Sequence, residues 1–115
     1  MLFSRKLYTI YIDWRRRKGR LEEKEEDEEE KEEKKTGGGG EVDVSWMRKR
    51  DLHILTTNIY TYTGDARFSV IHPQNSDEWN MKIDYAQKRD AGIYECQVNT
   101  EPKMNMAIML NVDGK

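Results

Sequence analysis

Residues 90–96 of this chain read Asp-Ala-Gly-Ile-Tyr-Glu-Cys, and this stretch decides the fold. Its glycine tolerates the tight backbone approach that a corner requires. The residues after the glycine predict a strand, in which Tyr94 and Cys96 share one face and Glu95 lies on the other. Two residues far upstream, Trp46 and Arg67, complete the pattern. The segment therefore predicts a corner that leads into a strand of a β-protein.

Short segments with the two-residue period of strands lie on both sides of this corner. The pattern predicts strands over residues 42–47, 52–57, 59–63, 68–72, 79–83, 93–99 and 104–112. Gly64, Asp65, Pro73 and residues 74–77 separate several of these strands as turn formers. Many short strands between turns, without a helical period, predict an all-β sandwich.

The D-x-G-x-Y-x-C spacing, with Trp46 and Arg67 ahead of it, resembles that of a variable-type (V-set) immunoglobulin β-sandwich. In such domains the tyrosine hydroxyl turns back to the backbone at the corner. The resemblance also implies that Asp90 pairs with Arg67, and that Trp46 and Cys96 face each other across two stacked β-layers. It assigns structural roles to Trp46, Arg67, Asp90, Gly92, Tyr94 and Cys96.

Residues 1–40 differ in composition from residues 41–115. They hold 11 Lys/Arg and 11 Asp/Glu, which include the whole of the low-complexity acidic run at residues 22–35. Without apolar side chains, that run has no face to bury, and Gly37–Gly40 then provide a flexible linker. We therefore expect a charged leader over residues 1–40, disordered or partly helical, before a folded unit over residues 41–115.

The leader leaves alternatives open. Residues 7–12 alternate and are compatible with a short strand. Residues 1–14 match a secretory signal poorly, because charged residues interrupt the apolar stretch and a basic run at residues 15–20 follows it. That basic run suggests phosphate groups of nucleic acid or membranes, but the adjacent acidic run weakens its field. The acidic run is either a charged spacer, which we favour, or an interaction tail.

Residues 44–112 are similar to the first immunoglobulin domain of the defective proboscis extension response (Dpr) proteins of insects. The similarity rests on VSWMRKRDLHILTTNIYTYTGDARFSVIHP (44–73), DEWNMKIDYAQKRDAGIYECQVNTEPKMNM (77–106) and LNV (110–112). It implies a neuronal cell-surface adhesion module that acts in synaptic partner choice. It also implies domain-to-domain binding to a second immunoglobulin-superfamily receptor, a Dpr-interacting protein, through the sheet of strands C, C′, C″, F and G, without a cofactor.

The sequence departs from this family upstream of Trp46. The family carries strands A and B there, with a strand-B cysteine that pairs with the one on strand F, whereas Cys96 is the single cysteine of this chain. Losing such a bridge costs about 2–5 kcal/mol, and losing strand B exposes an edge of strand E. We therefore expect a sandwich without strands A and B, marginal or unfolded alone unless residues 7–12 supply a strand. The alternative is a non-binding fragment or gene-model product without a stable fold, retained in the cell.

Strand parity predicts which side chains would meet a partner. If Trp46 and Cys96 point inward, their neighbours at odd positions point outward, and the family resemblance adds contacts on C′ and C″. The predicted partner-binding residues are Met47, Lys49, Leu55, Tyr60, Tyr62, Gln97 and Asn99. For the two tyrosines, partner contact and packing against their own neighbours are both open.

No motif predicts catalysis, a metal site or a small-molecule substrate. The sequence shows no nucleophile–base pair in a motif context and no phosphate-binding loop. One cysteine and two histidines do not make a ligand set for a metal, so Cys96 is expected to be a buried structural residue. We therefore expect a protein-binding module that is not an enzyme and has no nucleic-acid partner.

Overall fold

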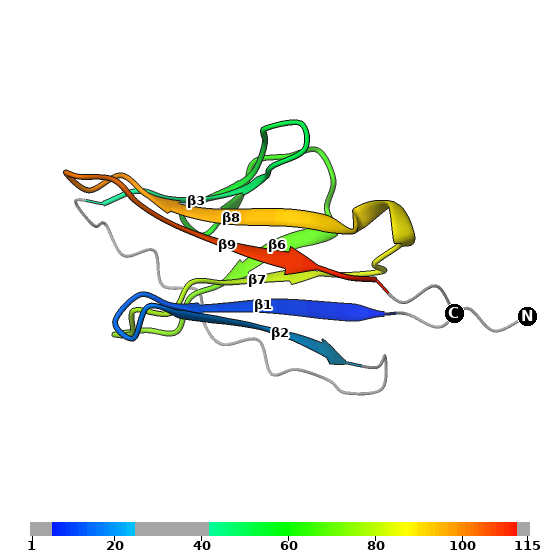
Figure 1. Cartoon of the computed structure of the whole chain (residues 1–115), viewed down its shortest axis with the longest axis horizontal. Coiled ribbons are helices and arrows are strands. Elements are labelled where there is room, and N and C mark those ends of the chain that lie inside the picture. The colour runs from blue at the N-terminus through cyan, green and yellow to red at the C-terminus, as the bar shows by residue number, and fades with distance from the viewer. Residues whose placement is uncertain (1–5, 25–41, 113–115) are drawn as a thin grey trace, which may run out of the picture.

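The computed structural model describes residues 6–24 and 42–112, which form two antiparallel β-sheets (Figure 1). The first sheet has the order β2-β1-β7-β6 and the second the order β5-β4-β3-β8-β9. The elements are β1 (Leu7–Asp13), β2 (Lys18–Lys24), β3 (Val44–Arg48), β4 (His53–Thr57), β5 (Tyr60–Thr61), β6 (Phe68–Ile71), β7 (Asn80–Ile83), the 3-10 turn η1 (Lys88–Asp90), β8 (Gly92–Val98) and β9 (Met104–Leu110). The prediction of an all-β sandwich is confirmed.

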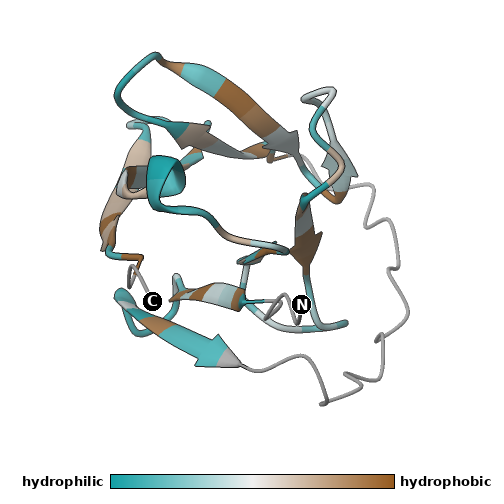
Figure 2. Ribbon diagram, turned by 90° about the vertical axis from the view of Figure 1, so that its right-hand side faces the viewer, coloured by the Kyte–Doolittle hydropathy of each residue, from teal (hydrophilic) through white to brown (hydrophobic). Residues whose placement is uncertain are grey.

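The core lies between the two sheets and is built from alternate residues of their strands. Its largest fully buried side chains include Trp46 and Tyr94 from the second sheet and Phe68 and Ile10 from the first. Burial of one such side chain stabilises the fold by about 1.5–3 kcal/mol. Figure 2 shows hydrophobic segments along strands of both sheets, whereas the edge strand β2 is mostly hydrophilic.

The hairpin β1–β2 lies beside β7, in the place of strands A and B, which the sequence analysis expected to be absent. Tyr8, Ile10 and Ile12 lie in the core, and β1 pairs antiparallel with β7, with Ile10 opposite Met81. The alternation of these apolar residues allows one face of β1 to be buried, although charged residues follow directly. The structure therefore realises the alternative that the sequence left open, a strand over residues 7–12. The expectation that strand positions A and B stay empty and that residues 7–24 belong to a leader is wrong.

β2 closes the first sheet with a charged edge strand. The Arg20 guanidinium lies over the Tyr11 ring, 3.8 Å from its centroid, and Leu21 packs against the core. Gly19 lies so close to β9 that a Cβ at this position would come within 2.5 Å of the Ile108 side chain. The acidic run from residue 25 and the Gly37–Gly40 linker fall outside the described residues, so the domain boundary at residue 40 stays a prediction.

Trp46 and Cys96 are neighbours in the same sheet. They lie directly opposite each other in the register of β3 and β8, and both are fully buried. Register partners on adjacent strands point to the same side of a sheet, so both side chains enter the core from the second sheet. The expectation that they face each other across two layers is therefore wrong, and the first sheet supplies Ile10 and Ile12 to the core in place of a second cysteine.

Candidate protein-recognition face

The corner before β8 ties the two sheets together at one end of the sandwich. The Arg67 guanidinium donates two hydrogen bonds to the Asp90 carboxylate, with N–O distances of 2.7 and 3.0 Å. The Tyr94 hydroxyl donates to the Asp90 backbone carbonyl at 2.6 Å. Gly92 adopts a φ of +142°, a conformation that residues with a Cβ rarely adopt. These contacts are the ones that the sequence motif predicts, and they fix the direction in which β8 leaves the corner.

Cys96 lies in the interior of the sandwich as a free thiol. Its side chain is completely buried, and burial raises the pKa of the thiol to about 12. Because the thiolate is the nucleophilic form of cysteine, the thiol of the folded domain is protonated and shielded at neutral pH.

The folded chain is therefore expected to resist thiol reagents at pH 8. Ellman's reagent should label less than about a tenth of Cys96 in the time that a free thiol reacts completely, because the group is both inaccessible and protonated. The same chain in guanidinium chloride should release one equivalent of chromophore and serves as the control. Rapid stoichiometric labelling without denaturant would show that the core around Cys96 opens easily.

The opposite side of the second sheet faces away from the core, and its side chains form rows across the strands. The first row consists of Ile54, Met47, Glu95 and Ala107 on β4, β3, β8 and β9. The second row consists of Tyr60, Thr57, Ser45, Gln97 and Asn105 on β5, β4, β3, β8 and β9. Beyond the first row, Ile93 pairs with Met109. We call these residues, together with Lys49 and Tyr62, the outer face.

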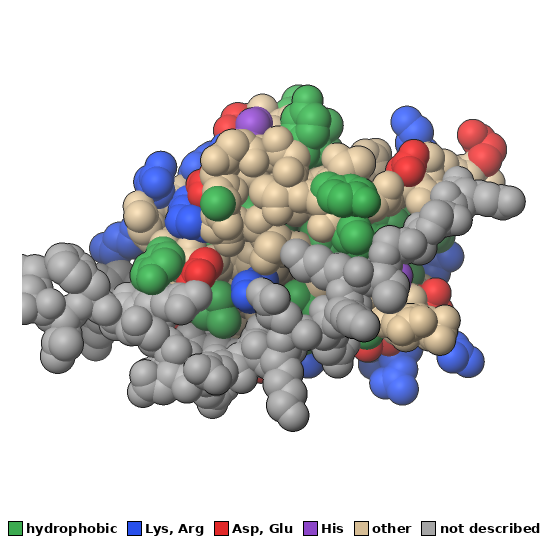
Figure 3. Space-filling model, turned by 180° about the vertical axis from the view of Figure 1, so that it is seen from behind, with side chains coloured by type: hydrophobic (Ala, Val, Ile, Leu, Met, Phe, Trp, Pro, Cys, Tyr) green, Lys and Arg blue, Asp and Glu red, His purple; other side chains and the backbone are tan. Residues whose placement is uncertain are grey.

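The outer face exposes large apolar side chains. Tyr60 and Tyr62 are each 69% exposed, Met109 is 53% exposed, and Ile54 and Ile93 are each 40% exposed. Seen from behind (Figure 3), the hydrophobic side chains of the molecule form separate groups, with other side chains and backbone between most of them and charged side chains mostly toward the edges. Because the two tyrosines are mostly in contact with solvent, packing against neighbours does not account for them. Exposed apolar groups with a polar rim are typical of protein-binding surfaces.

The structure brings most of the predicted contact residues onto this face. Met47 and Gln97 are half-buried members of its rows, while Lys49, Tyr60 and Tyr62 are exposed. Asn99 lies just beyond the end of β8, where its side-chain oxygen accepts from the Asp43 N–H at 2.7 Å and its amide donates to the Asp43 carboxylate at 3.2 Å. Asn99 therefore fastens the strand ends at the rim.

Leu55 is not part of the outer face, and the prediction that it contacts a partner is wrong. Its side chain is fully buried in the core. The register of β3 and β4 shifts between Trp46 and Met47, so that Met47 lies opposite Ile54. Such a β-bulge inserts an extra residue and reverses the inward and outward sides of a strand beyond it. Ile54 takes the outward position that the sequence analysis assigned to Leu55, and nothing in the local pattern reveals the bulge.

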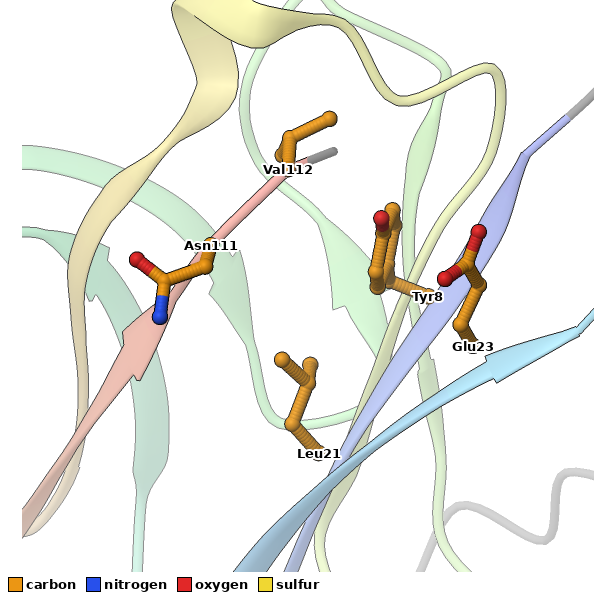
Figure 4. Close-up of a pocket in the computed structure, with 5 residues that line it drawn as sticks. All are labelled: Tyr8, Leu21, Glu23, Asn111 and Val112. Atoms are coloured by element: carbon orange, nitrogen blue, oxygen red, sulfur yellow. The ribbon is translucent and has the colours of Figure 1, made fainter. Parts of the chain in front are cut away.

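A separate groove lies between β2 and the end of β9. It has a volume of about 420 Å³ and is lined by Tyr8, Leu21, Glu23, Asn111 and Val112 (Figure 4). Its size is that of a small-ligand site, but Glu23 is the one ionisable carboxylate among the lining residues, and no nucleophile or second carboxylate accompanies it. The groove therefore lacks the paired acid and base groups of a hydrolytic centre.

The described residues contain no group of three or more histidine, cysteine, aspartate or glutamate side chains arranged to hold a metal ion. Within the same ranges, no helix has the length and the apolar character needed to cross a membrane.

Comparison with known proteins agrees with this architecture. No protein-family model matches the chain. The structure of Dpr1 IG1 bound to DIP-eta IG1 is 57% identical in sequence, with a TM-score of 0.59, over 63% of this chain and 68% of that one. Dpr2 Ig1-Ig2 in complex with DIP-Theta Ig1-Ig3 is 60% identical, with a TM-score of 0.62, over 65% of this chain and 34% of that one. The Zwei Ig domain protein zig-8 of Caenorhabditis elegans is 29% identical over 72 residues, which are 63% of this chain and 26% of that protein.

The two sheets, the Arg67–Asp90–Tyr94 corner and the exposed outer face define a variable-type immunoglobulin domain of the kind used in protein recognition, not in catalysis. The chain belongs to the Dpr family and corresponds to the first immunoglobulin domain of its members. It spans about a third of the Dpr2 chain and about a quarter of zig-8.

Proposed function

We propose that this chain is a neuronal cell-surface recognition module that binds the first immunoglobulin domain of a Dpr-interacting-protein-like receptor through its outer face. The observation that carries the proposal is the exposure of Ile54, Tyr60, Tyr62, Ile93 and Met109 on one side of a sheet whose other side is fully packed. Strands hold four of these side chains, and Tyr62 follows β5 with its backbone N–H bonded to the Leu55 carbonyl at 2.9 Å. Binding therefore orders little that is mobile beforehand. Tyrosine is a frequent anchor of such interfaces because it buries much area with few rotatable bonds.

The relatives support this choice of partner. The related Dpr1 and Dpr2 domains are described in complexes with DIP-eta and DIP-Theta, in which both members carry immunoglobulin domains. On the outer face of this chain, the proposed contact residues are Met47, Lys49, Ile54, Tyr60, Tyr62 and Gln97, with Asn99 at the rim. The proposed biological role is the choice of partner cells at synapses.

Tyr60→Asp and Tyr62→Asp are each expected to weaken binding to such a receptor at least about 100-fold, which is typical of the loss of an interface anchor. Each change places a charge where an apolar ring would be buried, and it leaves the fold intact because both side chains are mostly exposed. Surface plasmon resonance of the full chain over immobilised first domains of DIP-eta and DIP-theta measures the effect.

Tyr85→Asp is the matched control for these two variants. Tyr85 is 52% exposed but lies in the connection between β7 and η1, outside the five-stranded sheet. Its replacement should leave the affinity within about threefold of wild type, as expected for a surface site outside an interface. If Tyr60→Asp and Tyr62→Asp both bind with unchanged affinity, the contact surface is not the outer face. If the wild-type chain binds neither receptor, the proposed function is wrong.

A further inference from the structure

One carboxylate lies in the middle of the outer face. Glu95 of β8 has Met47 of β3 and Ala107 of β9 as its register neighbours. Its side chain is only 12% exposed, and its Oε2 lies 3.2 Å from the Lys49 Nζ. A charged group is thus embedded in the more apolar half of the face, which also carries Ile54, Ile93 and Met109.

Lys49 is held where it meets this carboxylate. It follows the last residue of β3, and its backbone N–H donates to the Ile93 carbonyl at 2.9 Å, which keeps it alongside β8. The neighbouring cation, Arg48, is engaged elsewhere, because its guanidinium binds the Asp51 carboxylate at 2.9–3.2 Å. Lys49 is therefore the cation that neutralises Glu95 in the free domain.

The ion pair leaves Glu95 short of hydrogen bonds. A carboxylate has about four acceptor positions, whereas the described part of the chain offers the Glu95 side chain one polar contact, the Lys49 ammonium group. In the free domain solvent can satisfy the remaining positions. A partner that covers the face excludes this solvent, and a dehydrated carboxylate without donors is strongly unfavourable.

We propose that Glu95 determines which partners the outer face accepts and that Lys49 positions and neutralises its charge. This inference rests on the proposed function of the outer face. The partner surface that fits is apolar and carries one hydrogen-bond donor opposite Glu95, such as a lysine, arginine, amide or hydroxyl group. A surface with a carboxylate at that point is rejected, because like charges repel strongly in a dehydrated contact.

Binding of the full chain to immobilised first domains of DIP-eta and DIP-theta tests this inference with five variants. Glu95→Gln should weaken binding at least about 30-fold, mainly through faster dissociation, as expected when one member of a buried charge pair is removed. Lys49→Met should weaken binding comparably, and Lys49→Arg should keep most of the affinity. In the double variant Glu95→Gln/Lys49→Met, the loss of binding free energy should be smaller than the sum of the two single losses. Asp51→Asn, which breaks the exposed ion pair at the neighbouring turn, should stay within about threefold of wild type.

The outcomes separate this inference from the proposed function. Thermal melts of the variants within a few degrees of wild type establish that they fold, and Lys49→Met decides the question if Glu95→Gln does not fold. If Glu95→Gln and Lys49→Met both bind with the affinity of the wild type, the role of Glu95 is overturned and the binding face stays in place. Binding that is lost in Tyr60→Asp, Glu95→Gln and Lys49→Met, and retained in Lys49→Arg, supports both. A wild-type chain that binds neither domain would overturn both.

Discussion

Replacing Ile10 with aspartate is expected to unfold the domain at 25 °C. Ile10 is completely buried between the sheets and anchors β1 beside β7. Truncating such a side chain to alanine costs about 2–5 kcal/mol, and an unpaired carboxylate in the same position adds several kcal/mol more. That sum is comparable with the lower half of the roughly 5–15 kcal/mol by which small domains are stable. Circular dichroism and size-exclusion chromatography of purified residues 1–115 measure the effect.

Tyr11→Asp on the same strand is the control, because Tyr11 points to the opposite side of β1 and is only half-buried. It should retain a cooperative melt, and Ile10→Ala should lower the midpoint by about 10 °C or more. If Ile10→Asp melts at the same midpoint as the wild type, β1 does not pack into the sandwich in solution. This pair of variants therefore tests whether residues 7–13 replace the strand that family members carry beside β7.

Asp90→Ala is expected to destabilise the domain by about 3 kcal/mol at pH 7. Removing one member of a buried ion pair costs roughly 3–5 kcal/mol, and the lower end applies because Asp65 also accepts hydrogen bonds from Arg67 at 2.9–3.2 Å. The change also leaves the Gln87 N–H without the carboxylate that it contacts at 2.8 Å. A midpoint lower by about 10 °C or more follows for a domain of this size, and thermal melts measure it.

The same variant is expected to reveal a pH dependence. Burial raises the pKa of the Asp90 carboxyl, but the hydrogen bonds from Arg67 and from the Gln87 N–H lower it by more, so the net pKa lies below its ordinary value of 3.8. A carboxyl with a lower pKa in the folded state adds stability that is complete above the unfolded pKa and is lost as the pH falls through the folded pKa. The difference in midpoint between wild type and Asp90→Ala should therefore be constant from pH 7 to about 5 and should shrink below about 4.

Asp51→Asn provides the comparison for Asp90→Ala. Asp51 binds Arg48 with similar geometry, and the side-chain hydrogen bond from Arg48 lowers the pKa of Asp51 to about 2, but the aspartate is exposed to solvent. Exposed ion pairs contribute little to stability, so the melting midpoint of Asp51→Asn should stay near that of wild type at pH 7. A gap between wild type and Asp90→Ala that widens toward pH 3 would contradict the assigned role of the Arg67–Asp90 pair.

The corner and the sandwich class were predictable because their signals are local. Asp90, Gly92, Tyr94 and Cys96 lie within one short segment, and each interacts with the backbone or with a neighbouring strand in the way that its chemistry favours. The period of two along most strands likewise reports which side chains are buried. The outward positions of Met47 and Gln97 followed from the same parity, whereas Tyr60 and Tyr62 came from the resemblance to the Dpr domains.

Three features depended on contacts between distant segments, and the sequence did not reveal them. The register of β3 and β4 shifts between Trp46 and Met47, and this bulge places Ile54 instead of Leu55 on the outer face. The bulge depends on how the two strands pair, which neither strand shows alone. The pairing of β1 with β7 joins residues 8–10 to residues 81–83, so the charge of the surrounding leader hid a strand that the core needed. The pair Lys49–Glu95 forms because β3 and β8 are adjacent in the sheet. Amino-acid type and local period thus determined which segments are strands, while the free energy of packing them together decided their order, their register and the face that remains for a partner.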